Sequence, residues 1–128
     1  MPSVLQHFVA PGLVKARVYI VPIVKYKGSE ESARTLRCAT LQGKGYAALT
    51  RIAEQERTTL DESDLSELGL DEQIFTTCTA DASDPFAMSR ARAAELNATL
   101  VPTYVIDGEI FTGLPTQADL EGAIRAAL

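Results

Sequence analysis

The feature that most constrains the fold is an Asp-Gly pair between two short runs of strand-forming residues. Asp107-Gly108 separates Thr103–Ile106 from Glu109–Thr112, and both runs contain β-branched and aromatic residues. A two-residue Asp-Gly loop favours a type I′ turn, because both of its residues must adopt positive φ. The sequence therefore predicts a β-hairpin over residues 103–112 that any proposed fold must contain.

A further strand is expected near the start of the chain, over residues 16–24. This stretch, Ala-Arg-Val-Tyr-Ile-Val-Pro-Ile-Val, is apolar at consecutive positions, as in a strand that is covered on both faces. Pro22 lacks an N–H and therefore belongs near the end of the strand or at a sheet edge.

Helices are expected before, between and after these strands. Pro11-Gly12 ends the first of them, and Ser29 and Thr116 are placed as N-caps of two others. Asp84-Pro85 combines an N-cap with a proline at the first helical position. The expected helices are 3–9, 29–42, 44–56, 61–68, 71–77, 85–96 and 117–128.

Two of these helices have predicted buried faces. In the helix over 44–56 the face is formed by Tyr46, Leu49, Ile52 and Ala53. In the helix over 117–128 it is formed by Leu120, Ile124 and Leu128.

Composition excludes several classes of protein. The chain has 128 residues, of which 46% are hydrophobic and 23% are charged, which suits one folded domain and not a disordered chain. Its net charge of −5 argues against nucleic-acid binding, which needs a basic surface to neutralise phosphates. No apolar run has the length of a membrane span, and no signal peptide is expected at the given start.

The acidic residues are concentrated in one stretch. Between Glu54 and Glu72 eight carboxylates are opposed by Arg57 alone. Such a run is typical of the solvated outer face of short helices, so these side chains are expected to be exposed. No two of them share a core-like stretch, and no acid/base pair is predicted.

The two cysteines leave their own chemistry open. Cys38 and Cys78 are too far apart for a Cys-x-x-Cys redox pair or a zinc knuckle. They are either two buried, inert thiols or one disulfide, which would close a loop of about 40 residues and contribute about 4 kcal/mol in the chain-entropy model. A disulfide would imply an oxidising compartment.

Other chemistries find little support. His7 is the only histidine and has no evident partner for a nucleophilic relay. The soft-metal donors His7, Cys38, Cys78 and Met88 match no known spacing, and Gly43-Lys-Gly45 lacks the rest of a phosphate loop. We therefore predict no metal site, no cofactor and no catalytic residue in this chain.

The chain nevertheless resembles a known family. The run from Asn97 to Pro115, Asn-Ala-Thr-Leu-Val-Pro-Thr-Tyr-Val-Ile-Asp-Gly-Glu-Ile-Phe-Thr-Gly-Leu-Pro, followed by a terminal helix, resembles the second half of a thioredoxin-like domain. The closest likeness is to the bacterial thiol:disulfide interchange proteins of the Dsb type, in their isomerase-like branch. Residues 18–24, 29–34 and 37–39 and Gly43-Lys-Gly45 extend the likeness towards the second strand of that family and its helical insertion.

The resemblance implies the fold and the position of a site. We expect an α/β, thioredoxin-like fold in a single domain over residues 1–128, with a helical insertion over about 29–97 and the first strand absent through N-terminal truncation. Val101-Pro102 would be a cis peptide, and Val101, Pro102 and Thr103 would bind substrate. A structural Cys38–Cys78 disulfide and a periplasmic location are also implied, or a cytoplasmic one if the start is genuine.

The resemblance also frames the function. The family's reactive Cys-x-x-Cys is missing, so the chain is expected to be a relative of the disulfide oxidoreductases and isomerases without dithiol activity of its own. Its partners would be protein or peptide substrates in extended form, with neither nucleic acid nor membrane insertion. The alternatives are a non-catalytic peptide- or partner-binding module, and a cytosolic scaffold with two unrelated thiols.

A final expectation concerns the missing strand. Its absence would leave unpaired backbone groups between residues 16–24 and the hairpin, and buried groups of this kind cost about 1–3 kcal/mol each. We therefore predict that residues 16–24 either pair antiparallel with the hairpin or borrow a strand from a second copy, which would make a homodimer.

Overall fold

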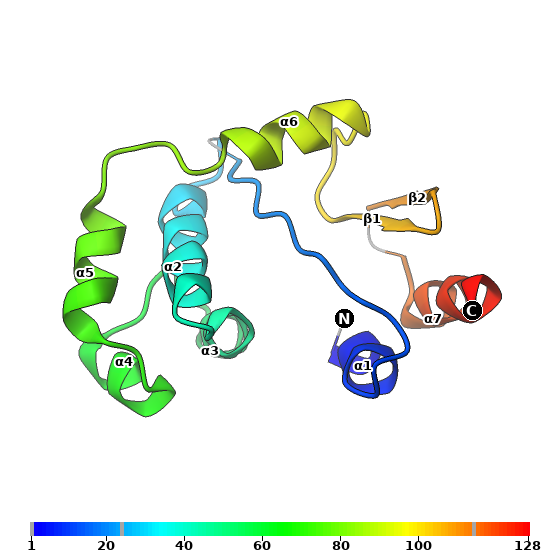
Figure 1. The fold of residues 1–128 in the computed structure, drawn as a ribbon. Coiled ribbons are helices and arrows are strands. Elements are labelled where there is room, and N and C mark those ends of the chain that lie inside the picture. Colours follow the sequence, from blue (N-terminus) through cyan, green and yellow to red (C-terminus); the bar gives the residue numbers. More distant parts are fainter. Residues whose placement is uncertain (1, 24, 114) are drawn as a thin grey trace. The chain divides into compact units, whose positions relative to one another are not determined.

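The computed structural model describes residues 2–23, 25–113 and 115–128. It divides into two units, each of which is described by itself (Figure 1). Unit 1 comprises Met1–Tyr19 and Arg90–Leu128, and unit 2 comprises Ile20–Ser89. The segment predicted as a helical insertion thus overlaps unit 2 for most of its length.

Helices predominate among the described residues. In chain order the elements are α1 (Pro2–Val4), η1 (Leu5–Val9), α2 (Ser29–Leu41), α3 (Gly45–Gln55), α4 (Glu62–Leu68), α5 (Glu72–Ala80), α6 (Ala87–Glu95), β1 (Thr103–Ile106), β2 (Glu109–Thr112) and α7 (Gln117–Ala127). Each helix predicted from the sequence has a counterpart here, although the first one is a short α-turn that continues as a π-helix. None of the helices in the described part of the chain is long and apolar enough to cross a membrane.

The predicted hairpin is confirmed to the residue. β1 pairs antiparallel with β2, with Val105 opposite Ile110 and Ile106 opposite Glu109. Asp107 has a φ of 48° and Gly108 a φ of 83°, so both turn residues occupy the left-handed region, as a type I′ turn requires. These strands form a two-stranded sheet.

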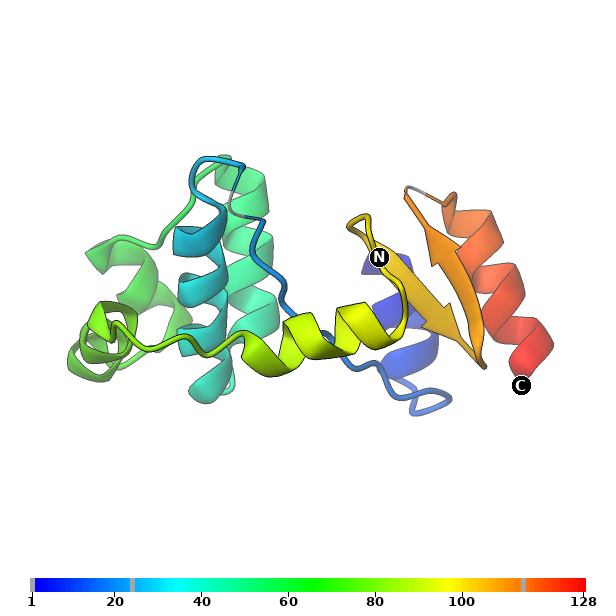
Figure 2. The ribbon, with the colours of Figure 1, turned by 90° about the horizontal axis from the view of Figure 1, so that it is seen from above.

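The core of unit 1 lies between this hairpin and the helices from the two ends of the chain (Figure 2). Val4 and Phe8 pack with Leu120 and Ile124, and Tyr104 and Ile106 of β1 lie against them. Thr116 and Asp119 form a capping box at the start of α7, which confirms the predicted N-cap. The prediction for Leu128 was wrong: it is 66% exposed, because it follows the last turn of the helix.

The predicted strand over residues 16–24 is wrong. Residues 14–23 have no regular secondary structure, and Val24 lies outside the described residues. No described residue of this segment pairs with the hairpin, so the predicted antiparallel closure does not occur. Strand-forming composition creates a strand only where a partner strand is available, and β-propensity largely reflects that packing. Self-association through this segment remains a proposal.

Unit 2 is a group of helices around one apolar cluster. The buried members of this cluster come from α2 to α5 and their connections: Cys38, Ala39, Ala48, Ile52, Leu60, Leu65, Leu70 and Phe75. A disulfide joins Cys38 of α2 to Cys78 of α5, with the two Cα atoms 5.9 Å apart. The prediction that these cysteines lie within disulfide range is confirmed.

The helix starts of unit 2 follow the sequence with one correction. Asp61 and Asp71 are the N-caps of α4 and α5, and each side chain accepts a backbone N–H three residues later. Ser29, however, is the first residue of α2, and Gly28 occupies the cap position. Gly28 has a φ of 81°, and a Cβ there would lie 2.6 Å from Cγ2 of Thr58. The Ser29 hydroxyl instead accepts the N–H of Ile23 at 2.8 Å.

The buried face of α3 also differs from the prediction. Ala48 and Ile52 are buried, whereas Tyr46 is 55% and Leu49 42% exposed. The helix presents its four-residue ridge of small and branched side chains to α2, so its aromatic side remains in solvent. The sequence pattern defined an apolar stripe that was broader than the contact.

Candidate functional site

The predicted substrate-binding residues form the entry to β1. The Val101–Pro102 peptide bond is cis, the isomer that the resemblance implied. Two hydrogen bonds fix the loop: Thr103 Oγ1 donates to the Leu100 carbonyl at 2.6 Å, and the Gly113 N–H donates to the Pro102 carbonyl at 3.1 Å. The second bond extends the hairpin ladder by one pair, so the loop is held on the sheet.

Val101 is the most accessible part of this loop. It is 53% exposed, while Pro102 and Thr103 are half-buried. Neither the N–H nor the C=O of Val101 has a hydrogen-bond partner among the described residues. A backbone amide that is held in place, exposed and unpaired can pair with another extended chain.

The cysteines offer no thiol beside this loop. The sequence contains two cysteines, and both are in the disulfide of unit 2. Cys38 is 3% exposed and packs in the apolar cluster of that unit. Thiol–disulfide exchange requires an accessible thiolate, and the oxidised chain has none.

A groove lies along β1 in unit 1. We call it the β1 groove; it measures about 450 Å³, and most of its lining is apolar. Residues 103–107 form one side, residues 13–18 the other, and side chains of α1 and α7 complete the lining. Sequence reasoning missed this groove, because it placed residues 16–24 in a paired strand.

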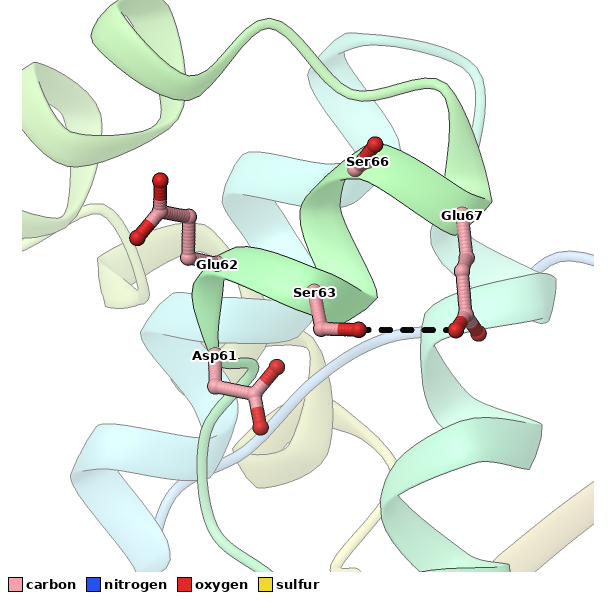
Figure 3. Close-up of a pocket in the computed structure, with 5 residues that line it drawn as sticks. All are labelled: Asp61, Glu62, Ser63, Ser66 and Glu67. Atoms are coloured by element: carbon pink, nitrogen blue, oxygen red, sulfur yellow. Dashed lines mark hydrogen bonds between the residues drawn. The ribbon is translucent and has the colours of Figure 1, made fainter.

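A second hollow, of about 570 Å³, lies on α4 of unit 2 (Figure 3). It is lined by acidic and hydroxyl side chains: Asp61, Glu62, Ser63, Ser66 and Glu67. Ser63 donates to Glu67 at 3.4 Å, and Figure 3 shows Glu62 pointing away from this pair. In the described part of the chain, no group of three or more His, Cys, Asp or Glu side chains is placed to hold a metal ion.

Beside this hollow the acidic run contains a buried carboxylate. Asp64 is 3% exposed, so the prediction that the whole run faces solvent was wrong. Arg57 and Arg51 both donate to its oxygens, the latter at 2.8 Å, and the Asp61 N–H donates to it at 2.9 Å. The hydrogen bond from Arg57, together with those of Asp61 and Arg51, lowers the pKa of Asp64 to about 2 against the opposing effect of burial.

This cluster is structural in character. Its arginine and carboxylate groups neutralise one another, and Arg51 also reaches Glu67 at 2.7 Å. The pairing crosses from α3 to α4, so neither helical periodicity nor spacing along the chain could have revealed it.

His7 lies near another carboxylate. Its Nδ1 atom is 3.6 Å from Oε1 of Glu121, and its side chain is 52% exposed. The pKa of Glu121 is lowered, first by the hydrogen bond that Gln117 donates to it at 3.0 Å. No nucleophilic side chain completes a relay with this pair among the hydrogen bonds of the described residues.

The hairpin, its cis-proline entry and the closing helix α7 define a mixed helical and β domain of the thioredoxin type. The chain belongs to the thioredoxin family: the family model described as Thioredoxin matches residues 1–126. Membership supports a general thiol–disulfide oxidoreductase-like role. Comparisons with curated proteins and with solved structures found no match.

Proposed function

We propose that this chain is a relative of the Dsb-type thiol:disulfide interchange proteins, in their isomerase-like branch, that binds extended protein substrates and has no dithiol activity of its own. The observation that carries the proposal is Val101. Its backbone N–H and C=O are unpaired and its side chain is exposed, at the entry to a strand in a thioredoxin-family domain. Val101, Pro102 and Thr103 are the proposed substrate-binding residues.

The proposed division of labour follows from the chemistry of exchange. A thiolate attacks a disulfide sulfur, a mixed disulfide forms, and the other sulfur leaves as a thiolate. The chain as given supplies no such thiolate, so its contribution is to hold an extended substrate by backbone hydrogen bonds. The Cys38–Cys78 bond supports the proposed periplasmic location, because disulfides persist in oxidising compartments.

A second function is favoured by the state of the cysteines. Because the only two are bonded to each other, the same loop also serves a non-catalytic module that binds peptides or a partner subunit. This alternative needs no thiol elsewhere.

Two assays test these functions. In an insulin-reduction assay with dithiothreitol, we expect no acceleration by this chain, and turnover would overturn the claim that it lacks dithiol activity. In a binding assay with a reduced, carboxymethylated unfolded protein, we expect Val101→Asp to weaken binding and Met88→Asp, at a side chain that is 84% exposed, to leave it unchanged. Equal binding by the two variants would remove the proposed substrate site.

A further inference from the structure

The β1 groove has an unpaired strand edge on one side. In an antiparallel hairpin with a two-residue loop, opposite residues alternate between hydrogen-bonded and non-hydrogen-bonded pairs, starting from the bonded pair beside the turn. Ile106 and Tyr104 therefore bond to β2, and the printed bond from Gly113 to Pro102 has the same parity. Thr103 and Val105 consequently direct their N–H and C=O groups away from β2, towards the free edge.

The other side of the groove is also unpaired backbone. The segment over residues 15–18 begins where the Val14 N–H donates to the Phe8 carbonyl at 3.1 Å, and it continues without regular structure (Figure 1). None of its backbone groups has a backbone hydrogen-bond partner among the described residues. Val18 is 67% exposed, although it belongs to an apolar alternation with Val14 and Ala16.

The remaining lining determines what could lie between these two sides. Val4, Leu120 and Ile124 are buried core residues that also line the groove. An occupant that places alternate side chains against them must be apolar at every second position, which is the pattern of a strand. β1 has four residues, so the occupant needs about the same length, or about 13 Å.

Charge at the groove selects among occupants. Lys15 and Arg17 line it, and neither has an ion-pair partner in the part of the chain that the structure describes. A second copy inserting its own residues 14–18 would bring the same two cations against them, and like charges on neighbouring strands destabilise pairing. Carboxylates on the intervening positions of another chain would instead be attracted.

We propose that the β1 groove binds an extended segment of another polypeptide, apolar at alternate positions and acidic between them, which adds a strand to the free edge of β1 at Thr103 and Val105. This is β-strand addition, in which backbone hydrogen bonds supply affinity and alternate side-chain contacts supply specificity. The inference goes beyond the proposed function, because it requires neither thiol chemistry nor the Val101 loop.

The probe is a fluorescein-labelled hexapeptide that alternates valine and glutamate, measured by fluorescence anisotropy. Two matched peptides serve as comparisons: one replaces glutamate by lysine, and the other keeps every side chain but has N-methylated backbone amides. We expect the valine–glutamate peptide to bind and both others to bind about tenfold or more weakly. Equal binding of the N-methylated peptide would show that no strand is added and would overturn the proposal.

Charge reversal tests the position of the peptide. Lys15→Glu/Arg17→Glu alters two exposed side chains, and we expect it to weaken the valine–glutamate peptide about tenfold and to strengthen the valine–lysine peptide. Lys25→Glu/Lys27→Glu makes the same change of net charge in unit 2 and should alter neither affinity. Equal effects of the two double variants would place the binding outside the groove.

Amide hydrogen exchange distinguishes the occupants. With the peptide bound, we expect the Val105 amide and those of residues 15–18 to become protected, while the Val101 amide does not. Sedimentation of the chain alone tests the other occupant: a dimer in which the Val105 amide is already protected would show that a second copy fills the groove, and would overturn the proposal. Loss of substrate binding at Val101 with peptide binding intact would refute only the proposed function.

Discussion

Unit 2 and unit 1 differ in how completely their interactions are satisfied. Unit 2 carries twelve Asp and Glu residues against seven Lys and Arg, yet its one buried carboxylate, Asp64, is bound by two arginines and its helices α2 and α5 are joined by a disulfide. Unit 1 carries five of each charge and has a smaller buried cluster. It also leaves one strand edge and an adjacent segment without backbone partners.

The difference indicates where binding takes place. A unit whose polar groups are paired and whose helices are covalently joined gains stability but offers little to a partner. A unit that keeps unpaired backbone beside an apolar groove is less stable but can accept another chain. The proposed substrate loop and the β1 groove both belong to unit 1, whereas unit 2 has the character of a scaffold.

Removing the disulfide should have the largest effect, and only on unit 2. Cys38→Ala/Cys78→Ala opens a loop with a sequence separation of 40 residues, and we expect a loss of about 4 kcal/mol in the unfolding free energy of that unit. Hydrogen exchange of the α2 and α5 amides measures this loss. Amides of β1 and α7 are the internal control, and an equal loss there would show that the two units unfold together.

The reverse experiment weakens unit 1. Leu120 is 4% exposed and packs against Val4 and Phe8, so Leu120→Ala should cost about 3 kcal/mol through lost contacts and a cavity. Leu128→Ala, at an exposed position that follows the same helix, is the matched control and should change stability little. Exchange that rises in α2 rather than in β1 would contradict the division into units.

Breaking the charge cluster should have a smaller effect on unit 2. Asp64→Asn leaves Arg51 and Arg57 without their shared carboxylate, and we expect a loss of about 2 kcal/mol, because the arginines are partly exposed and recover water. Glu62→Gln changes an exposed acid on the same helix and serves as control. Urea unfolding followed at unit 2 compares the two variants.

Acid should destabilise unit 2 through the same carboxylate. The pKa of Asp64 in the folded chain is about 2, below the model value of 3.8, so ionised Asp64 favours the folded state. Its contribution is complete above about pH 4 and is lost as the pH falls through 2. The Asp64→Asn variant should lack this part of the pH dependence; a parallel pH profile for both proteins would refute the assignment.

The smallest predicted effect concerns helix capping. Thr116 Oγ1 accepts the Asp119 N–H at 3.1 Å in unit 1, and Thr116→Ala should cost about 1 kcal/mol. Thr116→Ser keeps the acceptor and should restore most of that loss. Thermal unfolding of the three proteins provides the comparison, and equal melting temperatures for alanine and serine would exclude capping as the cause.

Local signals in the sequence predicted local structure well. The Asp107-Gly108 turn, the Asp61 and Asp71 caps and the glycines that end α2 and α4 each act within a few residues, so their effect is visible in the chain itself. The hairpin was therefore predicted with its register. The entry loop at Val101–Pro102 came from the resemblance to a family and not from such a signal.

Features that depend on distant partners were not predictable in the same way. Residues 16–23 have strand-forming side chains, but no partner strand is present among the described residues, and the composition alone gave the wrong structure. Asp64 appeared to be one more solvated acid, since its arginine partners come from α3 and from the loop that follows it. The β1 groove depends on both of these kinds of information, an absent partner and a tertiary contact.

The division of the chain into units also has a consequence for its synthesis. Unit 2 is contiguous, so Ile20–Ser89 can fold as soon as it leaves the ribosome, and Cys78 meets Cys38 with no other cysteine to compete. The first helix of unit 1 must wait for α7, which is made last; at ribosomal speeds this delay is on the order of ten seconds. During that interval Val4 and Phe8 are exposed on the nascent chain, where they form a binding site for a chaperone.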